Sequence, residues 1–315
     1  MNEPDIMVYL MTGFLDSGKT QFLTFTLKQD YFQIDGKTLL ILCEEGEEEY
    51  DPMEMLKYGV VIEKVEDQED LTAEWLEEMN RKHEPERVVV EYNGMWKVSD
   101  FENLELPAGW GIEQKITTVD ASTFQTYLTN LKPLFVEMVR GADMVLFNRC
   151  EDIKPLAGYR RSVKVVSPQA EVIFEDEQGE IENIFEDEVP YDLKAPVVEI
   201  AKEDYGIWYV DMMENPDRYK GKVVEYTAKV LKPRTFPAKV FMAGRMAMTC
   251  CADDVSFLGY VCRSAYAPKL KPGQWVKIRA KIRFANLSVY RGEGPVLEAE
   301  HIELAEPVDE LVYFN

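Results

Sequence analysis

An apolar run that leads directly into the pattern G-x-x-x-x-G-K-T constrains this chain more than any other feature. The run covers residues 7–12, the pattern covers Gly13 to Thr20, and residues 21–28 can continue as a helix. A strand, a loop and a helix in this order are the context that a phosphate-binding loop requires. Glycines let successive N–H groups face one concavity, and the helix adds its positive end. The pattern therefore predicts a site for a chain of phosphates.

The lysine and the threonine of this loop each have an expected role. Lys19 would reach the outer phosphates, and the Thr20 hydroxyl would hold Mg²⁺. The residues of the loop that we expect to bind nucleotide are Gly13, Asp16, Ser17, Gly18, Lys19 and Thr20.

Composition narrows the class of protein and its partners. With 315 residues, of which 46% are hydrophobic, the chain can bury a sizeable core and suggests about two domains. No apolar run approaches the roughly 18 residues that span a bilayer, and the N-terminus has no signal pattern, so we expect a cytoplasmic protein without membrane insertion. A net charge of −23 would repel nucleic acid. Five cysteines, an odd number, fit a reducing compartment.

Strand and helix signals alternate through the first two-thirds of the chain. Helical spacing is found at 71–79 and again at 124–138, where one helix is expected. This alternation predicts an α/β, doubly wound P-loop NTPase domain, in which ligands bind at the carboxyl ends of the strands. The predicted strands are 7–12, 38–43, 88–90, 114–119, 143–147 and 171–174.

Polar residues fall where these strands end. Glu91 follows the strand at 88–90 and would hold Mg²⁺ or its waters, although a solvated strand end is the alternative. The backbone N–H of Gly94 would contact a terminal phosphate. Asn148 is the candidate reader of the base, and Glu151 would accept hydrogen bonds from N1 and N2 of guanine. The preference between guanine and adenine stays open at this stage.

These segments resemble the CobW/HypB/UreG group of P-loop GTPases, and most of all its CobW branch. The resemblance covers about residues 5–175 and includes a Glu-x-x-Gly motif, which is Glu91-Tyr92-Asn93-Gly94 here. It implies binding of GTP and Mg²⁺, slow hydrolysis, and a role in moving or inserting a metal or metallocofactor. The quoted segments are GFLDSGKT, EEGEE, VVVEYNG, TVDA, FNRCED and SPQAEVI.

The chain departs from this family in two motifs. The Cys-x-Cys-Cys metal motif would lie at about 61–71, where the sequence has acidic residues and no thiol. The usual thiolate route for coupling a metal to GTP hydrolysis is therefore missing. The Asn-Lys-x-Asp motif is replaced by Asn148-Arg149-Cys150-Glu151.

The C-terminal third changes class. We expect a P-loop GTPase domain at 1–177, an acidic linker or crossing segment at 178–204, and an OB-like β-barrel domain at 205–315. The barrel would be antiparallel and is predicted from five strand-like runs, at 222–231, 238–249, 255–262, 274–284 and 296–304.

A cysteine group stands out in this third. The group contains Cys250, Cys251 and Cys262. Adjacent cysteines on a strand point to opposite faces, so Cys262 with one of Cys250 or Cys251, helped by Asp253, could bind Zn²⁺. Three thiols without a histidine fall short of a tetrahedral set, which favours a role as buried small hydrophobic residues. The run Thr-Cys-Cys-Ala-x-Asp resembles the C-terminal domain of a poorly characterised bacterial family associated with a two-component permease. That resemblance implies a protein that works beside a transporter.

Three functions remain open. The first is a Mg²⁺-dependent GTPase in which Lys19 and Glu91 serve catalysis and Glu45 or Glu47 positions water or a second cation. The second is a nucleotide-gated binding or scaffold protein that does not hydrolyse. The third is a metal-binding protein that uses the C-terminal cysteines. We favour the first, with a metalloprotein or a transporter as its client.

Overall fold

The apolar run at the start of the chain forms a buried strand near the middle of a sheet. The computed structural model describes residues 4–153, 156–181, 189–248, 255–290, 292–308 and 311–312. Strand β1 (Ile6–Thr12) pairs in parallel with β4 on one side and β5 on the other. Val8 and Leu10 are fully buried. Because helices cover both faces of such a sheet, its strands are continuously apolar rather than alternating.

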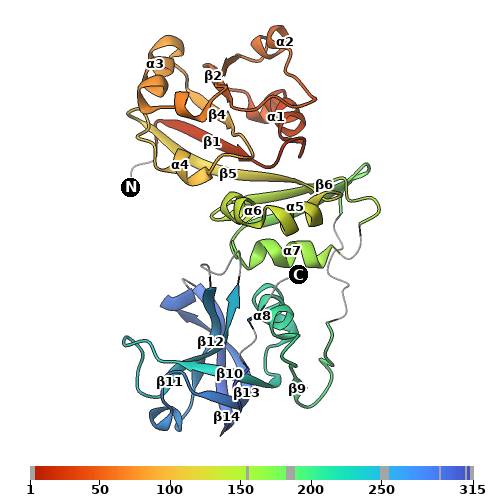
Figure 1. Ribbon diagram of the computed structural model, residues 1–315, viewed down its shortest axis with the longest axis vertical. Coiled ribbons are helices and arrows are strands. Elements are labelled where there is room, and N and C mark those ends of the chain that lie inside the picture. Colours follow the sequence, from red (N-terminus) through yellow and green to blue (C-terminus); the bar gives the residue numbers. More distant parts are fainter. Residues whose placement is uncertain are drawn as a thin grey trace. The chain divides into compact units, whose positions relative to one another are not determined.

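The described residues of this part form an eight-stranded sheet in the order β3-β2-β4-β1-β5-β6-β7-β8 (Figure 1). All its pairings are parallel except the β7–β8 hairpin. Its strands after β1 are β2 (Thr38–Leu42), β3 (Val60–Lys64), β4 (Arg87–Glu91), β5 (Trp110–Asp120), β6 (Met144–Asn148), β7 (Glu171–Asp176) and β8 (Gly179–Glu180). Its helices are α1 (Lys19–Leu27), α2 (Pro52–Leu56), α3 (Ala73–His83), α4 (Val98–Glu102), α5 (Phe124–Asn130) and α6 (Lys132–Val139).

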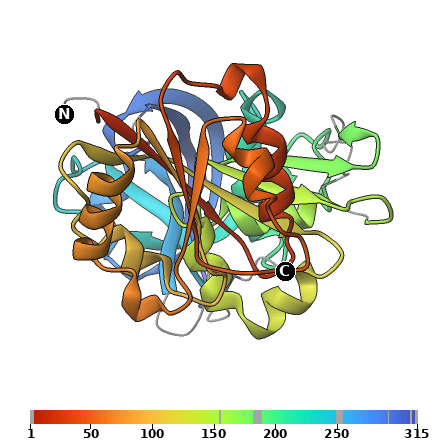
Figure 2. The same ribbon diagram turned by 90° about the horizontal axis from the view of Figure 1, so that it is seen from above.

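Helices α1 and α3 lie on opposite faces of this sheet (Figure 2). The chain moves outward from β1 to β2 through α1 and returns inward from β3 to β4 through α3. Right-handed crossovers in opposite directions place their helices on opposite faces. The sheet is therefore doubly wound, and the order of the strands switches beside β1, where the ligand site of such a sheet is expected.

Two local elements differ from the sequence-based expectation. Strand β3 was not predicted, because only Val60, Val61 and Ile62 are apolar before Glu63. The helix predicted at 124–138 is two helices, α5 and α6, and Pro133 lies in the first turn of the second. Proline has no N–H to continue the hydrogen bonding of the preceding helix, and Leu131 between them leaves helical geometry.

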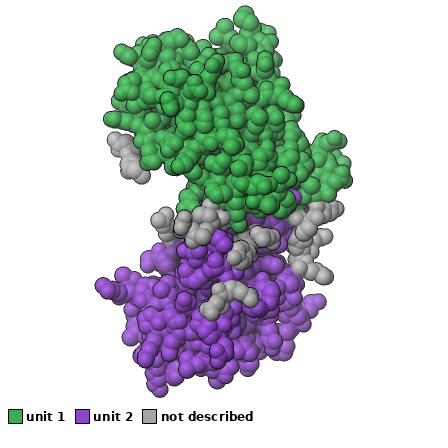
Figure 3. All heavy atoms as spheres, in the orientation of Figure 1, with its two compact units in different colours: residues 1–156, 166–184 green, residues 157–165, 185–315 purple. Residues whose placement is uncertain are grey.

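The chain divides into two compact units (Figure 3). The first contains residues 1–156 and 166–184, and the second contains residues 157–165 and 185–315. Helix α7 (Ala157–Lys164), which connects β6 to β7, therefore groups with the second unit. There Arg160 Nε donates at 2.8 Å to Glu214 Oε1, in the last residue of α8 (Tyr205–Glu214).

The second unit is built on a sheet whose described strands run in the order β11-β12-β14-β13-β10-β9. Strand β10 also pairs with β11, so five of these strands form a circular order. The pairing is antiparallel except between β12 and β14 and between β9 and β10. The elements are β9 (Val198–Glu199), α8 (Tyr205–Glu214), β10 (Val223–Leu231), β11 (Val240–Met248), β12 (Val255–Arg263), β13 (Trp275–Leu287) and β14 (Gly292–Leu304).

Aromatic side chains fill the core of the second unit. Trp208 of α8 lies 4.6 Å from Tyr226 and 5.4 Å from Tyr260, measured between ring centroids. Tyr191 and Val198, from the segment expected to be a linker, are buried in the same core. That part of the acidic segment therefore belongs to a folded unit. None of the helices in the described ranges has the length and apolar composition needed to cross a bilayer.

We predict that Gly244→Ala destabilises the second unit. Gly244 of β11 pairs with Gly259 of β12, and a Cβ at Gly244 would lie 2.1 Å from the carbonyl oxygen of Leu258. Overpacking of this kind costs about 1–3 kcal/mol. Thermal unfolding should show a lower Tm for Gly244→Ala and an unchanged Tm for the control Gly292→Ala, whose added Cβ meets no atom within 4 Å. Equal Tm values for the two variants would contradict this account.

Candidate functional site

A pocket opens where the loop after β1 meets the carboxyl ends of β2, β4 and β6. Four segments far apart in the sequence meet there: the phosphate-binding loop, the β2–α2 loop (residues 43–51), the end of β4, and Arg149 after β6. The pocket is lined by Leu15, Asp16, Gly18, Lys19, Thr20, Gln21, Glu44, Gly46, Glu47, Glu48, Glu91 and Arg149.

The phosphate-binding loop has the compact turn that its glycines predicted. Gly13 has φ +144° and Gly18 has φ +90°, values that side chains rarely allow. The Ser17 N–H donates to the Phe14 carbonyl at 3.1 Å, and the Ser17 hydroxyl lies 2.9 Å from Thr118 Oγ1 of β5. These contacts fix the curvature of the loop against the sheet.

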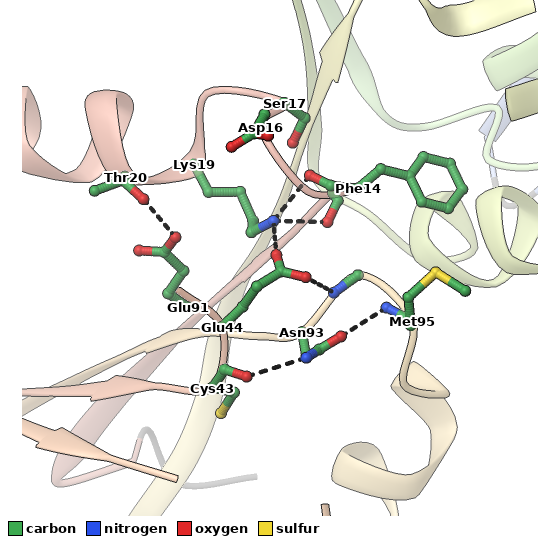
Figure 4. A network of polar contacts seen from close by, with 12 residues as sticks. Phe14, Asp16, Ser17, Lys19, Thr20, Cys43, Glu44, Glu91, Asn93 and Met95 are labelled. Carbon is green, nitrogen blue, oxygen red and sulfur yellow. Dashed lines mark hydrogen bonds and ion pairs between the residues drawn. The ribbon is translucent and has the colours of Figure 1, made fainter. Parts of the chain in front are cut away.

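The Lys19 ammonium is buried and held by three oxygen atoms (Figure 4). Its Nζ donates to the carbonyls of Gly13 and Phe14, each at 2.9 Å, and forms an ion pair with Glu44 Oε2 at 2.5 Å. A buried charge must be paired and hydrogen bonded to be tolerated. The loop thus carries a fixed positive charge at the position where the sequence predicted a phosphate-binding lysine.

Glu44 was not among the predicted site residues. Its Oε2 contacts Lys19, and its Oε1 accepts from the backbone N–H of Gly94 at 3.3 Å. It follows the buried Cys43, the first residue after β2, and it begins a run of glutamates. The glutamates of this run differ only in the distant residues that they contact, which the local sequence does not show. The strand end was the available signal, but within this loop only Glu45 and Glu47 were predicted to serve the site.

Glu91 lies at the end of β4, as predicted, and is buried. Its Oε1 accepts from the Thr20 hydroxyl at 2.7 Å, and its Oε2 accepts a short hydrogen bond from the Tyr50 hydroxyl. Burial raises the pKa of the Glu91 carboxyl, and the hydrogen bonds from Tyr50 and Thr20 offset only part of that effect. Tyr50, like Glu44, was missed because its contact with Glu91 joins residues 41 positions apart.

The segment after Glu91 packs closely on the phosphate-binding loop. A Cβ at Gly94 would lie 2.5 Å from the Gly13 carbonyl oxygen and 2.8 Å from the Cα of Phe14, so only glycine fits. Asn93 Nδ2 donates to the Cys43 carbonyl at 3.2 Å, and its Oδ1 accepts from the Met95 N–H at 2.9 Å (Figure 4). The Gly94 amide is thereby fixed next to the Lys19 ammonium.

Asn148 and Arg149 reach the outer side of the phosphate-binding loop. Asn148 Nδ2 donates to the Ser17 carbonyl at 2.8 Å, and its buried Oδ1 has no hydrogen-bond partner among the described residues. Arg149 donates to the Asp16 carbonyl at 3.1 Å and forms an ion pair with Asp120. Burial would raise the pKa of Asp120, but hydrogen bonds from Ser122 and Arg149 outweigh it and hold that pKa below its usual value.

Two acidic residues predicted for the site lie outside the lining of the pocket. Glu45 is exposed and pairs with Lys64 of β3 rather than with the pocket. Glu151 is exposed, in the turn that follows β6. Glu47 does line the pocket, and its backbone N–H donates to Asp16 Oδ1 at 3.2 Å.

Only one cysteine of the predicted zinc site lies among the described residues. Cys250 and Cys251 lie outside the described residues, whereas Cys262 of β12 is fully buried. Burial raises the pKa of the Cys262 thiol, which disfavours the thiolate that binds metals. Within the described ranges, no group of three or more His, Cys, Asp or Glu side chains is placed to hold a metal ion.

Two family models cover almost the whole chain. The model described as the CobW/HypB/UreG nucleotide-binding domain matches residues 7–174, which is more than half of the chain. The model described as the DUF1980 C-terminal domain matches residues 177–314. No match to a curated protein was found.

Solved structures that are similar to this chain include two HypB proteins and one YjiA GTPase. The hydrogenase maturation factor HypB from Archaeoglobus fulgidus is 18% identical, with a TM-score of 0.40, over 55% of this chain and 83% of that chain. Zn(II)-bound YjiA GTPase from E. coli is 19% identical, with a TM-score of 0.43, over 82% and 89% respectively. HypB from Helicobacter pylori in complex with nickel is 12% identical, with a TM-score of 0.35, over 55% and 80%.

The raised pKa of Glu91 predicts a pH dependence of stability. The folded protein holds this proton more tightly than the unfolded chain, in which the pKa is near 4.5. The free energy of unfolding should therefore fall as pH rises from about 4.5 through the pKa of folded Glu91. Glu91→Gln has no titrating group at this position, so this fall in stability should be absent from the variant. Measured without nucleotide or Mg²⁺, the Tm of Glu91→Gln should therefore rise relative to that of the wild type over the same pH interval.

The control for this experiment is Glu77→Gln, which removes an exposed carboxylate from α3. Its Tm difference from the wild type should stay constant with pH. A Tm difference between Glu91→Gln and the wild type that does not change with pH would show that Glu91 titrates normally.

Proposed function

The chain belongs to the CobW/HypB/UreG family through its nucleotide-binding domain, and we propose that it is a Mg²⁺-dependent GTP-binding protein that hydrolyses GTP slowly and acts as a switch. The observation that carries this proposal is the convergence of Lys19, Thr20 and Glu91 at one pocket, where Glu44 of the lining also accepts from the Gly94 amide. Each is the kind of group that a triphosphate and its metal ion require.

The phosphates would be held by the backbone amides of the loop from Gly13 to Thr20 and by the Lys19 ammonium. The left-handed glycines and the N-terminus of α1 favour an anion there. Gly94 would contribute its N–H to the terminal phosphate, because no side chain separates its backbone from the loop. These groups stabilise negative charge where it develops during transfer of a phosphoryl group.

Thr20 and Glu91 fit the protein side of a magnesium site. A hydroxyl and a carboxylate 2.7 Å apart are the oxygen ligands that Mg²⁺ takes when phosphates and waters complete its shell. When bound, Mg²⁺ neutralises charge on the phosphate oxygens. For positioning a water molecule, Glu47 is better placed than Glu45, since Glu47 lines the pocket and Glu45 pairs with Lys64.

The base would lie beside Asn148. Asn148 donates to the Ser17 carbonyl, and its Oδ1 has no hydrogen-bond partner in the described part of the chain, so this oxygen could accept a hydrogen bond from a purine at the outer side of the loop. We propose that Glu151 accepts from guanine when nucleotide is bound. The family match and the motif from Asn148 to Glu151 support GTP over ATP.

For the C-terminal part, we propose an OB-like barrel. The circular pairing of five strands and the parallel β12–β14 pair support it. We retain the division into a GTPase domain at 1–177, a connecting segment at 178–204 and a second domain at 205–315. The two compact units support a two-part chain, although they assign α7 and residues 185–204 to the second part.

The client of the switch is proposed from the family alone and is a metalloprotein or a transporter. The acidic residues near the end of β3 offer no thiolates, so we propose no thiolate coupling there. A zinc site with Cys262, Cys250 and Cys251 stays a prediction, and the burial of Cys262 favours a packing role for that residue.

Removal of the Lys19 ammonium should weaken GTP binding about a hundredfold or more, because a buried charged contact with phosphate is lost. Calorimetric titration with GTP and Mg²⁺ compares wild type, Lys19→Ala and the control Lys64→Ala, which removes an exposed lysine. Phosphate release should also stop in Lys19→Ala only. Tight GTP binding without phosphate release in the wild type would favour the non-hydrolysing scaffold, and unchanged binding in Lys19→Ala would refute the nucleotide site.

Selectivity for the base should depend on Glu151. We expect the wild type to bind GTP more tightly than ATP, and Glu151→Ala to lose about tenfold of that preference. The neighbouring carboxylate is the control, and Asp152→Ala should keep the preference. Equal affinities of the wild type for GTP and ATP would point to a general nucleotide switch.

A further inference from the structure

The carboxylate of Glu44 joins the two groups that would bind a terminal phosphate. Its Oε2 lies 2.5 Å from Lys19 Nζ, and its Oε1 lies 3.3 Å from the Gly94 nitrogen (Figure 4). A carboxylate and a phosphate both present oxygen atoms with negative charge to N–H donors. Glu44 therefore supplies, from within the chain, an anion where the outermost phosphate would bind.

This contact differs from an ordinary surface ion pair. The side chains of Lys19 and Glu44 are 3% and 9% exposed, so water screens them little. Glu45, the next residue, pairs with Lys64 through side chains that are 65% and 58% exposed. Two adjacent glutamates thus make ion pairs in opposite environments. Loss of the Glu44 carboxylate would leave a buried ammonium without its charged partner, whereas loss of the exposed Glu45 pair would cost little.

The same loop also occupies the metal-binding carboxylate. Tyr50, at the far end of the β2–α2 loop, donates its hydroxyl hydrogen to Glu91. At the near end, the Cys43 carbonyl accepts from Asn93, two residues beyond Glu91. The β2–α2 loop therefore supplies an ion-pair partner to Lys19, through Glu44, and a hydrogen-bond donor to Glu91, through Tyr50.

We propose that Glu44 is an internal competitor of the terminal phosphate and determines how the site distinguishes a nucleoside triphosphate from a diphosphate. This inference rests on the proposed function. A triphosphate and Glu44 would bring like charges to the same donors, so the third phosphate binds only when the Glu44 carboxylate leaves. A diphosphate lacks that phosphate, so its second phosphate would reach Lys19 while Glu44 keeps the Gly94 amide.

Departure of Glu44 would move the β2–α2 loop. Gly46 packs on Asp16, and the Glu47 N–H donates to the same carboxylate, so the loop rests on the phosphate-binding loop at several points. Replacing the internal anion would release the near end of the loop and change its contacts. Binding of the terminal phosphate would in this way be coupled to a change in the conformation of the β2–α2 loop.

The test compares the wild type with Glu44→Gln, which keeps the shape of the side chain and removes its charge. Affinities for a non-hydrolysable GTP analogue and for GDP, each with Mg²⁺, are measured by calorimetry. We expect Glu44→Gln to bind the analogue about tenfold or more tightly than the wild type, and GDP within about threefold of it. The matched control is Glu49→Gln, an exposed carboxylate of the same loop, which should change neither affinity.

Equal changes for the analogue and GDP, or weaker binding of the analogue by Glu44→Gln, would overturn this inference. Hydrogen exchange of wild-type residues 44–49 provides a second measurement that needs no variant. It should change with the analogue and stay unchanged with GDP, and identical exchange in both states would also overturn the inference. If the wild type binds neither nucleotide, the proposed function itself fails, which is a distinct result.

Discussion

The buried ammonium of Lys19 is the constraint on which the site depends. It has to be satisfied by oxygen atoms, and two of these are carbonyls of the phosphate-binding loop itself. The third comes from Glu44, so the charge ties the end of β2 to the loop after β1. Because the Gly94 amide contacts the same carboxylate, three strand ends are held around one charge. A ligand that binds here must present a negatively charged oxygen atom to Lys19 in place of the Glu44 carboxylate.

Much of this arrangement could be predicted from the sequence, because it depends on local patterns. The apolar run, the two glycines and Lys19 specify the loop within a few residues of chain. Glu91 was predicted from its place after a buried strand, because the ends of parallel strands share an edge. The parallel order of the sheet follows from alternating strands and helices in the same way.

The rest depends on contacts between distant residues. Nothing within the run from Glu44 to Glu49 indicates which carboxylate turns inward, since that is decided by Lys19, 25 positions away. The sequence-based prediction assigned Glu45 or Glu47 to position water or a second cation, and it did not include Glu44, which contacts the lysine. Tyr50 is a similar case, because its partner lies in another strand. The break between α5 and α6 was different, since Pro133 was visible in the sequence and was outweighed by the apolar spacing.

The central claim is that a nucleoside triphosphate binds at Lys19 and replaces Glu44. The most direct measurement is a crystal structure of the wild-type chain with a non-hydrolysable GTP analogue and Mg²⁺. The account predicts a terminal phosphate within hydrogen-bond distance of Lys19 Nζ and the Gly94 nitrogen, Mg²⁺ near Thr20 and Glu91, and Glu44 withdrawn from both donors. A structure in which Glu44 still contacts Lys19 while the nucleotide is bound would contradict it.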